Sequence, residues 1–115
     1  LGLFICTLKM HRLLQVTPAK KALELYLGEL VVASAAWEWK AAQWTWLRLQ
    51  IRKADASLWV VEGKAWIEGQ PEPADWAIRF ERKSPPISGK AGVWGKPFAG
   101  TPIRFDNLEV TFLQP

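Results

Sequence analysis

The sequence predicts an all-β fold, an antiparallel sandwich of two sheets. Three observations support this prediction: apolar residues recur mostly at every second position, the strand-like runs are short, and turns rich in Gly and Pro separate them. Half of the 115 residues are hydrophobic, which is ordinary for a folded globular chain. This length suits a single domain over residues 1–115 and is too short for two.

Four short runs in the first third of the chain are expected to form strands. They cover residues 3–5, 13–16, 22–27 and 30–33. Residues 20–36 contain enough Ala, Leu and Glu for a helix, but their alternating and β-branched residues favour a meander of strands.

The centre of the chain shows the clearest period of two. In residues 45–52, three apolar side chains alternate with three polar ones, namely Leu47, Leu49 and Ile51 with Arg48, Gln50 and Arg52. A second strand is expected over 58–67, after a polar hairpin loop at 53–56. A third is expected from Asp75 to Glu81, beyond the two prolines of 69–73, with Trp76, Ile78 and Phe80 on its apolar side.

Two further strands are expected near the end of the chain, over residues 91–94 and 103–112. Phe105 begins the apolar side of the last one, and Leu108, Val110 and Phe112 continue it. Because Phe105 and Leu108 are three positions apart, the apolar side has to switch near Asp106 and Asn107, which predicts a β-bulge there.

Charge, cysteine and histidine content exclude several classes of function. The net charge is +4, and the basic residues are spread along the chain, so we expect no nucleic-acid partner. Cys6 and His11 are the only residues of their kinds, so we expect no internal disulfide and no metal cluster built on Cys. No metal site and no cofactor are assigned. No apolar run approaches the ~20 residues of a membrane span, because Lys9, His11 and Arg12 interrupt the first one.

Four sequence blocks between Trp44 and Val110 occur in a fixed order. They are Glu62-Gly63-Lys64-Ala65-Trp66, Gly69-Gln70-Pro71-Glu72-Pro73-Ala74-Asp75-Trp76, Ser88-Gly89-Lys90-Ala91-Gly92-Val93-Trp94-Gly95 and Ile103-Arg104-Phe105-Asp106-Asn107-Leu108-Glu109-Val110. This series resembles the C-terminal half of concanavalin A-like domains of the laminin G and glucanase type. It is most similar to domains attached to large secreted bacterial proteins, including those with pyrroloquinoline-quinone-type propeller repeats.

The resemblance implies a two-sheet jelly roll whose relatives include carbohydrate-binding modules, glycosidase relatives and domains of unknown role. Such a domain carries further strands ahead of the position of Leu1, so we expect this chain to lack its N-terminal strands and to be a fragment of a longer protein. The resemblance also implies a secreted or cell-envelope location. A glucanase of this fold presents a Glu-x-Asp-x-Glu strand, and this sequence contains none.

The predicted binding site is the polar side of the central strands. We expect it to bind carbohydrate, with Trp rings against the apolar face of a sugar and charged groups on its hydroxyls. The proposed ligand-binding residues are Trp46, Arg48, Lys64, Trp66, Arg79 and Glu81, with Gln50 and Glu62 on the same side. No catalytic residue is assigned, and the chain is expected not to be an enzyme.

Two alternatives remain open for that surface. In one, a loop or another domain of the parent protein covers it, and its Arg and Glu residues form cross-strand ion pairs, so that the domain is purely structural. In the other, the chain is a degenerate or partial glycoside hydrolase, for which Glu62 and Glu81 are the nearest candidate carboxylates.

The remaining candidates are interpreted more simply. Three tryptophans on the apolar sides of strands are expected in the core, namely Trp59, Trp76 and Trp94. Three others cluster near a loop and are a second possible contact surface, namely Trp37, Trp39 and Trp44. Glu72, between two prolines, is interpreted as part of a rigid turn. Asp106 and Asn107 could contribute oxygen ligands to calcium, but two residues are too few to assign a site.

Overall fold

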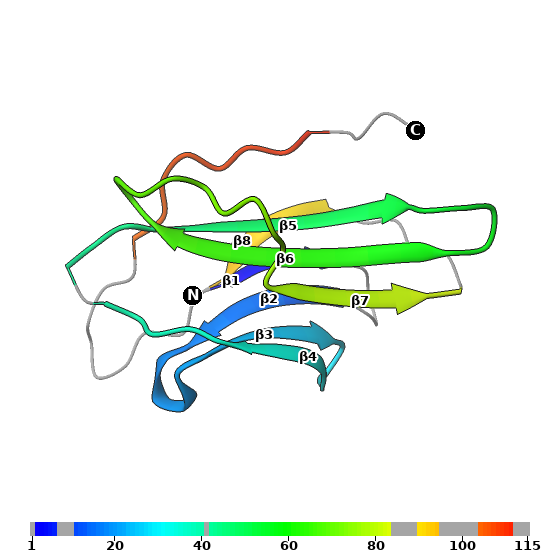
Figure 1. Ribbon diagram of the computed structural model, residues 1–115, viewed down its shortest axis with the longest axis horizontal. Helices are drawn as coiled ribbons and strands as arrows, with labels where there is room; N and C mark the ends of the chain where they lie inside the picture. Colours follow the sequence, from blue (N-terminus) through cyan, green and yellow to red (C-terminus); the bar gives the residue numbers. More distant parts are fainter. Residues whose placement is uncertain (1, 7–10, 41, 84–89, 95–103, 112–115) are drawn as a thin grey trace.

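The computed structural model describes residues 2–6, 11–40, 42–83, 90–94 and 104–111, and it shows two antiparallel β-sheets packed face to face (Figure 1). One sheet has five strands in the order β4-β3-β2-β1-β8, with the bounds β4 (Leu30–Ala36), β3 (Ala22–Leu27), β2 (His11–Thr17), β1 (Gly2–Cys6) and β8 (Lys90–Trp94). The other has three in the order β5-β6-β7, with the bounds β5 (Thr45–Lys53), β6 (Trp59–Ile67) and β7 (Ile78–Arg82). The predicted all-β, two-sheet architecture is confirmed.

The first four strands form a meander, as the alternating apolar residues predicted. A 3-10 turn, η1 (Pro18–Lys20), joins β2 to β3, and Lys21 closes it in the left-handed region with φ 50°. Gly28, with φ 61°, makes the tight connection between β3 and β4 without the steric cost that a side chain would impose there. The register of β3 and β4 shifts between Leu25 and Tyr26. Residues 20–36 are thus strands joined by turns and contain no α-helix.

Strands β5 and β6 form the longest hairpin of the described chain. Their register pairs Thr45 with Ile67 at one end and Lys53 with Trp59 at the other. At the turn, the backbone N–H groups of Ala54 and Asp55 both donate to the carbonyl of Leu58. This register places Leu47, Leu49 and Ile51 on the side that packs against the core, as the sequence predicted.

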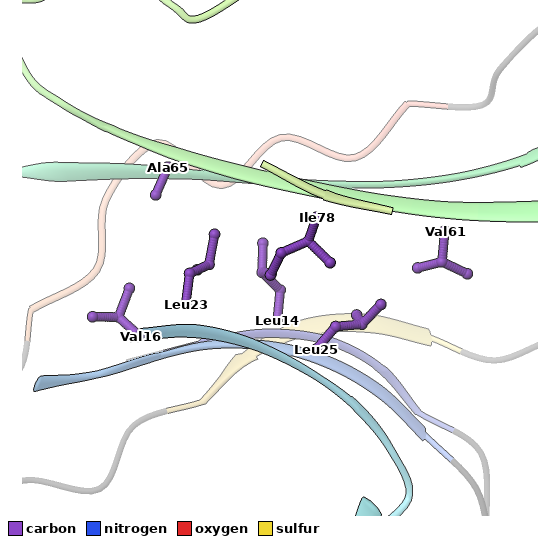
Figure 2. Packing of buried hydrophobic residues seen from close by; sticks show 7 residues of the cluster. All are labelled: Leu14, Val16, Leu23, Leu25, Val61, Ala65 and Ile78. Atoms are coloured by element: carbon purple, nitrogen blue, oxygen red, sulfur yellow. The ribbon is translucent and has the colours of Figure 1, made fainter. Parts of the chain in front are cut away.

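The core lies between the two sheets (Figure 2). The five-stranded sheet contributes Leu14 and Val16 from β2 and Leu23 and Leu25 from β3, while the other sheet contributes Val61, Ala65 and Ile78. Fully burying a side chain such as Leu or Val stabilises the fold by roughly 1.5–3 kcal/mol. The sheets face each other in matching order, with β7 against β4, β6 against β3 and β5 against β1.

The third strand of the small sheet begins later than predicted. It covers Ile78–Arg82, so residues 75–77 belong to the preceding loop. Trp76 therefore does not follow the alternation of Ile78 and Phe80, and the prediction that it lies in the core is wrong. A loop residue is free of the pleat that forces successive strand residues to opposite faces.

The predicted last strand is also wrong over the residues that can be compared. Residues 104–111 belong to no strand, and Phe105, Leu108 and Val110 are exposed. The chain does change direction where a bulge was predicted, because Asn107 has φ 54°, but there is no ladder for a bulge to interrupt. Ile103 and Phe112, at the ends of the predicted strand, lie outside the described residues.

The short strand predicted over 91–94 is confirmed as β8, which pairs antiparallel with β1. The side chain of Trp94 lies outside the part of the structure that can be described, and so do the side chains of Cys6 and His11. Within the described ranges, no helix is long and apolar enough to cross a membrane.

Candidate functional site

The predicted binding residues all lie on one surface, the side of the β5-β6-β7 sheet that faces away from the core, here called the outer face. The register places Trp46 opposite Trp66, Arg48 opposite Lys64 and Gln50 opposite Glu62. On the other side of β6, Glu62 is opposite Arg79 and Val60 is opposite Glu81. The period of two from β5 to β7 therefore predicted correctly which side chains share this face.

Trp46 and Trp66 form an aromatic pair at the end of the face where β5 begins and β6 ends. Their ring planes are 11° from parallel and their centroids are 6.0 Å apart. Nearly parallel rings at this separation are offset, so each covers only part of its neighbour. Both side chains are half-buried, and the indole N–H of Trp46 donates to the carboxylate of Glu68. The pair is thus oriented from the edge by Glu68 and remains partly open to solvent.

The loop from β6 to β7, residues 68–77, folds over the outer face and is here called the strap. It passes above the sheet in Figure 1. Glu72, near its middle, places Oε2 2.8 Å from Nη1 of Arg48 and 2.8 Å from Nζ of Lys64. The Lys64 ammonium also donates to the carbonyl of Pro73 at 2.6 Å. One carboxylate therefore bridges cations from two neighbouring strands and fixes the strap on the sheet.

Trp76 completes this cluster from the end of the strap. Its ring centroid lies 4.5 Å from Nζ of Lys64 and 5.7 Å from the guanidinium carbon of Arg48, within range of cation–π attraction. The ring of Trp66 is 6.0 Å from the same ammonium. Trp76 thus lies on the outer face, among the charges, and not in the core.

The two cations differ in how far they can be reached from solvent. The side chain of Lys64 is only 6% exposed because the strap and the Trp rings cover it, whereas Arg48 is 49% exposed. Lys64 is therefore in a position to fix the strap, and Arg48 is in a position to contact a ligand. Of the predicted binding residues, Trp46, Trp66, Arg48 and Lys64 are brought together.

Arg79 and Glu81 lie on the same outer face but form a separate pair on β7. The guanidinium of Arg79 reaches Oε1 of Glu81 at 2.9 Å, and both side chains are about half exposed. This pair lies within one strand, unlike the cross-strand ion pairs that the structural alternative predicted; Arg52 of β5 and Glu62 of β6 form a pair of that kind.

Glu62, the other candidate carboxylate, is buried at the centre of the outer face. Its side chain is 4% exposed, and Oε1 accepts hydrogen bonds from Arg52 at 2.6 Å and Gln50 at 3.3 Å. Its neighbour on the same face, Val60, is fully buried. The outer face is therefore closed to solvent at Glu62 and Val60.

Electrostatics separate Glu72 from an ordinary surface carboxyl. The hydrogen bond from Lys64 is the largest influence that lowers the pKa of Glu72, and the charges of Lys64 and Arg48 act in the same direction. Desolvation opposes them and is outweighed. The carboxylate form is thus favoured in the bridging position.

Sequence reasoning missed Glu68, Glu72 and Trp76 as members of this cluster. The motif 69–76, which contains Glu72 and Trp76 but not Glu68, was singled out, but Glu72 was interpreted only as part of a turn and Trp76 as a core residue. Two prolines flanking a carboxylate, in a loop that follows a strand bearing Lys64, were the available signal, although nothing local indicated where the loop would fold.

The other sheet carries a second polar cluster that the sequence did not reveal. Glu24, 4% exposed, accepts hydrogen bonds from Thr17 at 2.5 Å and Tyr26 at 3.4 Å, and lies 3.6 Å from the ammonium of Lys20. Burial raises the pKa of the Tyr26 phenol, and the nearby Glu24 charge raises it further. These groups therefore satisfy one another's hydrogen bonds and charges.

The remaining Trp residues take several roles. Trp37 and Trp39, partly buried, pack against the core, while Trp44 is 50% exposed, so the three do not form one surface. Trp59, the first residue of β6, is half-buried and is not among the residues of the core cluster, so its predicted core position is not confirmed. The ammonium of Lys53 lies 5.8 Å from its ring.

Asp106 and Asn107 are joined by a hydrogen bond between neighbouring residues. The carboxylate of Asp106 accepts the backbone N–H of Asn107 at 2.8 Å. Across the described residues, no three His, Cys, Asp or Glu side chains come together in a way that could hold a metal ion.

Comparison with known proteins yields no relative for this chain. No family model matches it, and no curated protein or solved structure matches it either.

Proposed function

We propose that the chain is a non-catalytic binding module and that the outer face binds carbohydrate through the Trp46–Trp66 pair. The observation that carries the proposal is the geometry of this pair: two nearly parallel indoles, half-buried, on the neighbouring strands β5 and β6. An indole face complements the apolar C–H face of a sugar ring, and a ring already held by its neighbours loses less entropy on binding.

Polar groups border the aromatic pair on the sides where hydroxyls would project. Glu68 lies at the indole N–H of Trp46, and the exposed guanidinium of Arg48 is the next outer-face side chain along β5. Charge-assisted hydrogen bonds of this kind fix the orientation of a ligand, while the rings contribute contact area. This division of roles supports a carbohydrate-binding site over a surface that serves only for packing.

The hydrolase alternative receives less support. Glycoside hydrolysis needs one carboxyl that delivers a proton and a second that attacks the sugar or activates water. Glu62 is buried and bonded to Arg52 at 2.6 Å, and Glu81 is bonded to Arg79 at 2.9 Å. Both carboxylates are committed to ion pairs, Glu62 with an arginine of the neighbouring strand β5 and Glu81 with an arginine of its own strand β7.

We also propose that the chain is part of a longer secreted or envelope protein with a concanavalin A-like jelly roll. The antiparallel five-plus-three arrangement is compatible with that fold, and the resemblance in residues 62–76 supports it. A structural role beside other domains of the parent is the second candidate function. It is favoured by the exposed Phe105, Leu108 and Val110 of the segment 104–111.

Glycan-array screening followed by calorimetry on the array hits tests the proposal. Trp66→Ala and Arg48→Ala are expected to weaken binding of the hit about three- to tenfold, through loss of a stacking surface or a charged hydrogen bond. Trp59→Ala, which removes a half-buried indole at the opposite end of β6 from Trp66, is the matched control and is expected to bind normally. Circular dichroism checks that each variant folds.

Two results would overturn the proposal. One is array binding that survives Trp66→Ala and Trp46→Ala. The other is turnover of a β-glucan that disappears in Glu62→Gln or Glu81→Gln, which would establish the hydrolase alternative instead. Absence of both binding and turnover in the parent protein would leave the structural role as the function.

A further inference from the structure

The contact between the strap and the sheet has the form of an occupied anion site. Its cations, Arg48 and Lys64, are register partners on β5 and β6, so the backbone ladder fixes them relative to each other. The ring of Trp76 covers both cations. The anion is the Glu72 carboxylate, whose single oxygen Oε2 lies 2.8 Å from each of them. The cations belong to the rigid sheet, and the carboxylate belongs to a loop.

The strap holds this carboxylate with few other contacts. Residues 70–75 are all exposed, and Glu72 itself is 39% exposed. The backbone N–H of Gln70 donates to Ile67 at the start of the strap, and Lys64 donates to Pro73. An ion pair between exposed side chains contributes only about 0–1 kcal/mol, so an external carboxylate can compete with Glu72 for Arg48.

The position of the anion site next to the aromatic pair suggests what such a competitor would be. Arg48 follows Trp46 on the same side of β5, and residues two apart on a strand are about 7 Å apart. One ligand with a flat apolar ring and a carboxylate could therefore contact both. The net charge of +4 further favours anionic ligands over neutral ones.

We propose that the ligand class is an acidic oligosaccharide, in which the carboxylate of a uronic acid residue replaces Glu72 at Arg48 while a sugar ring stacks on the Trp46–Trp66 pair. This inference rests on the proposed function and specifies its substrate class. Glu72 then acts as an internal competitor that occupies the anion site until a uronate displaces it. Lys64 keeps its bond to the carbonyl of Pro73, the residue after Glu72, and so holds the middle of the strap on the sheet while the Glu72 side chain is displaced.

The test compares the affinities of tetragalacturonate and cellotetraose, an acidic and a neutral oligosaccharide, by calorimetry. Glu72→Gln removes the competing charge with little change of shape, and the ratio of acidic to neutral affinity is expected to rise about two- to fivefold. Arg48→Gln is expected to lower the same ratio to about one, since it removes the exposed cation. Glu29→Gln, in the exposed turn between β3 and β4, is the control for net charge and is expected to leave the ratio unchanged.

Measurements on the unmodified chain provide a second test that depends on no variant folding. Affinity for tetragalacturonate is expected to fall several-fold between about 0.05 M and about 0.5 M NaCl, while cellotetraose binding stays constant, because salt screens only the charged contact. A sulfated carrageenan oligomer tests whether the site is selective for carboxylate or accepts any anion.

The outcomes separate the two proposals. An affinity ratio that is the same in Glu72→Gln, Arg48→Gln and the unmodified chain overturns the acidic-sugar inference and leaves carbohydrate binding intact. Stronger binding of the sulfated oligomer than of tetragalacturonate overturns the choice of a uronate. Failure of every oligosaccharide to bind, including to Glu72→Gln, overturns the proposed function together with the inference.

Discussion

Gly63 on β6 lies directly above Leu14 on β2, so close that a Cβ placed on the glycine would lie 2.6 Å from Cδ1 of the leucine and 3.2 Å from its Cδ2. Leu14 is fully buried, and Figure 2 shows it between the two sheets, among the side chains of the core. The absent side chain of Gly63 therefore sets how closely the centre of the small sheet approaches the five-stranded sheet.

Gly63→Ala is expected to destabilise the fold by about 1–3 kcal/mol, because the added methyl overpacks the core at Leu14. The clashing atom ends a side chain, but that side chain is enclosed and has little room to move. Chemical denaturation measures the free energy of unfolding. Leu14→Ala alone is expected to cost about 2–5 kcal/mol, and the double variant is expected to cost less than the sum of the two. If the losses in free energy of unfolding simply add in the double variant, the methyl at position 63 and the Leu14 side chain do not compete for the same volume in the core.

Two Arg–Glu pairs on the outer face are expected to differ in their contribution to stability. Arg52→Gln removes the charged partner of the Glu62 carboxylate, which is only 4% exposed, and leaves Gln50 as the other donor observed there. This change should lower the free energy of unfolding by about 1–3 kcal/mol. Arg79→Gln breaks a pair whose side chains are about half exposed and should cost less than about 1 kcal/mol. Urea unfolding of both variants makes the comparison. Equal losses would show that burial does not distinguish the two pairs.

The alternation of residues 45–52 and 58–67 was sufficient to predict the β5–β6 hairpin and the two faces of its sheet. Side-chain direction in a strand is fixed by the pleat, so a sequence period of two carries over directly into three dimensions. The meander of β2, β3 and β4 was predictable for the same reason. This is why Trp46 and Trp66 could be assigned to one surface before their contact was known.

The strap and the segment 104–111 were not predictable in this way. Trp76 precedes β7, so its direction depends on where the loop folds, and that is decided by contacts with Lys64 and Arg48 on distant parts of the chain. Alternating apolar residues such as Leu108 and Val110 indicate which side chains would share one face of a strand. They do not specify a neighbouring strand with which the segment could pair. Local patterns specify the faces of strands, whereas pairing and loop placement require long-range contacts.

Tyr26 is expected to ionise above the ordinary phenol pKa of 10.0, mainly because it is desolvated and secondarily because the charge of Glu24 opposes a second negative charge. It is the only tyrosine of the sequence, so ultraviolet absorbance of phenolate follows it directly. Glu24→Gln should lower this pKa, and Lys20→Met should raise it, since the Lys20 charge favours phenolate.

The effect of Tyr26 on stability has a definite sign. Because the pKa is raised in the folded chain, its contribution is fully present below the pKa of the unfolded chain and is lost as pH rises through the folded value. A midpoint at or below 10.0 in the folded protein, or a shift of the same sign in both variants, would contradict the assignment.

Glu72 provides the opposite pH dependence. Its folded-state pKa lies below the ordinary 4.5, chiefly because Lys64 donates a hydrogen bond to the carboxylate. Since the pKa is depressed on folding, the contact stabilises the folded chain above pH about 4.5 and is lost as pH falls through the lower, folded value. Acidification is therefore expected to release the Glu72 side chain from Arg48 and Lys64, which leaves the Lys64–Pro73 bond as the remaining observed contact of this part of the strap with the sheet.

NMR titration of the Glu72 side-chain carboxyl measures this pKa, and the indole N–H signal of Trp76 reports the strap. Both cations lower the pKa of Glu72 through a hydrogen bond and a charge, but the contributions of Lys64 are the larger ones. Lys64→Met should therefore raise this pKa more than Arg48→Met, since Lys64 is nearly buried and solvent screens its charge less. The Trp76 signal should titrate with the same midpoint as Glu72, since its ring contacts the cations that the carboxylate bridges. A larger shift in Arg48→Met would place the main contact of the strap at the exposed guanidinium. A Trp76 signal that does not change across the Glu72 midpoint would show that the strap is held by the Lys64–Pro73 bond alone.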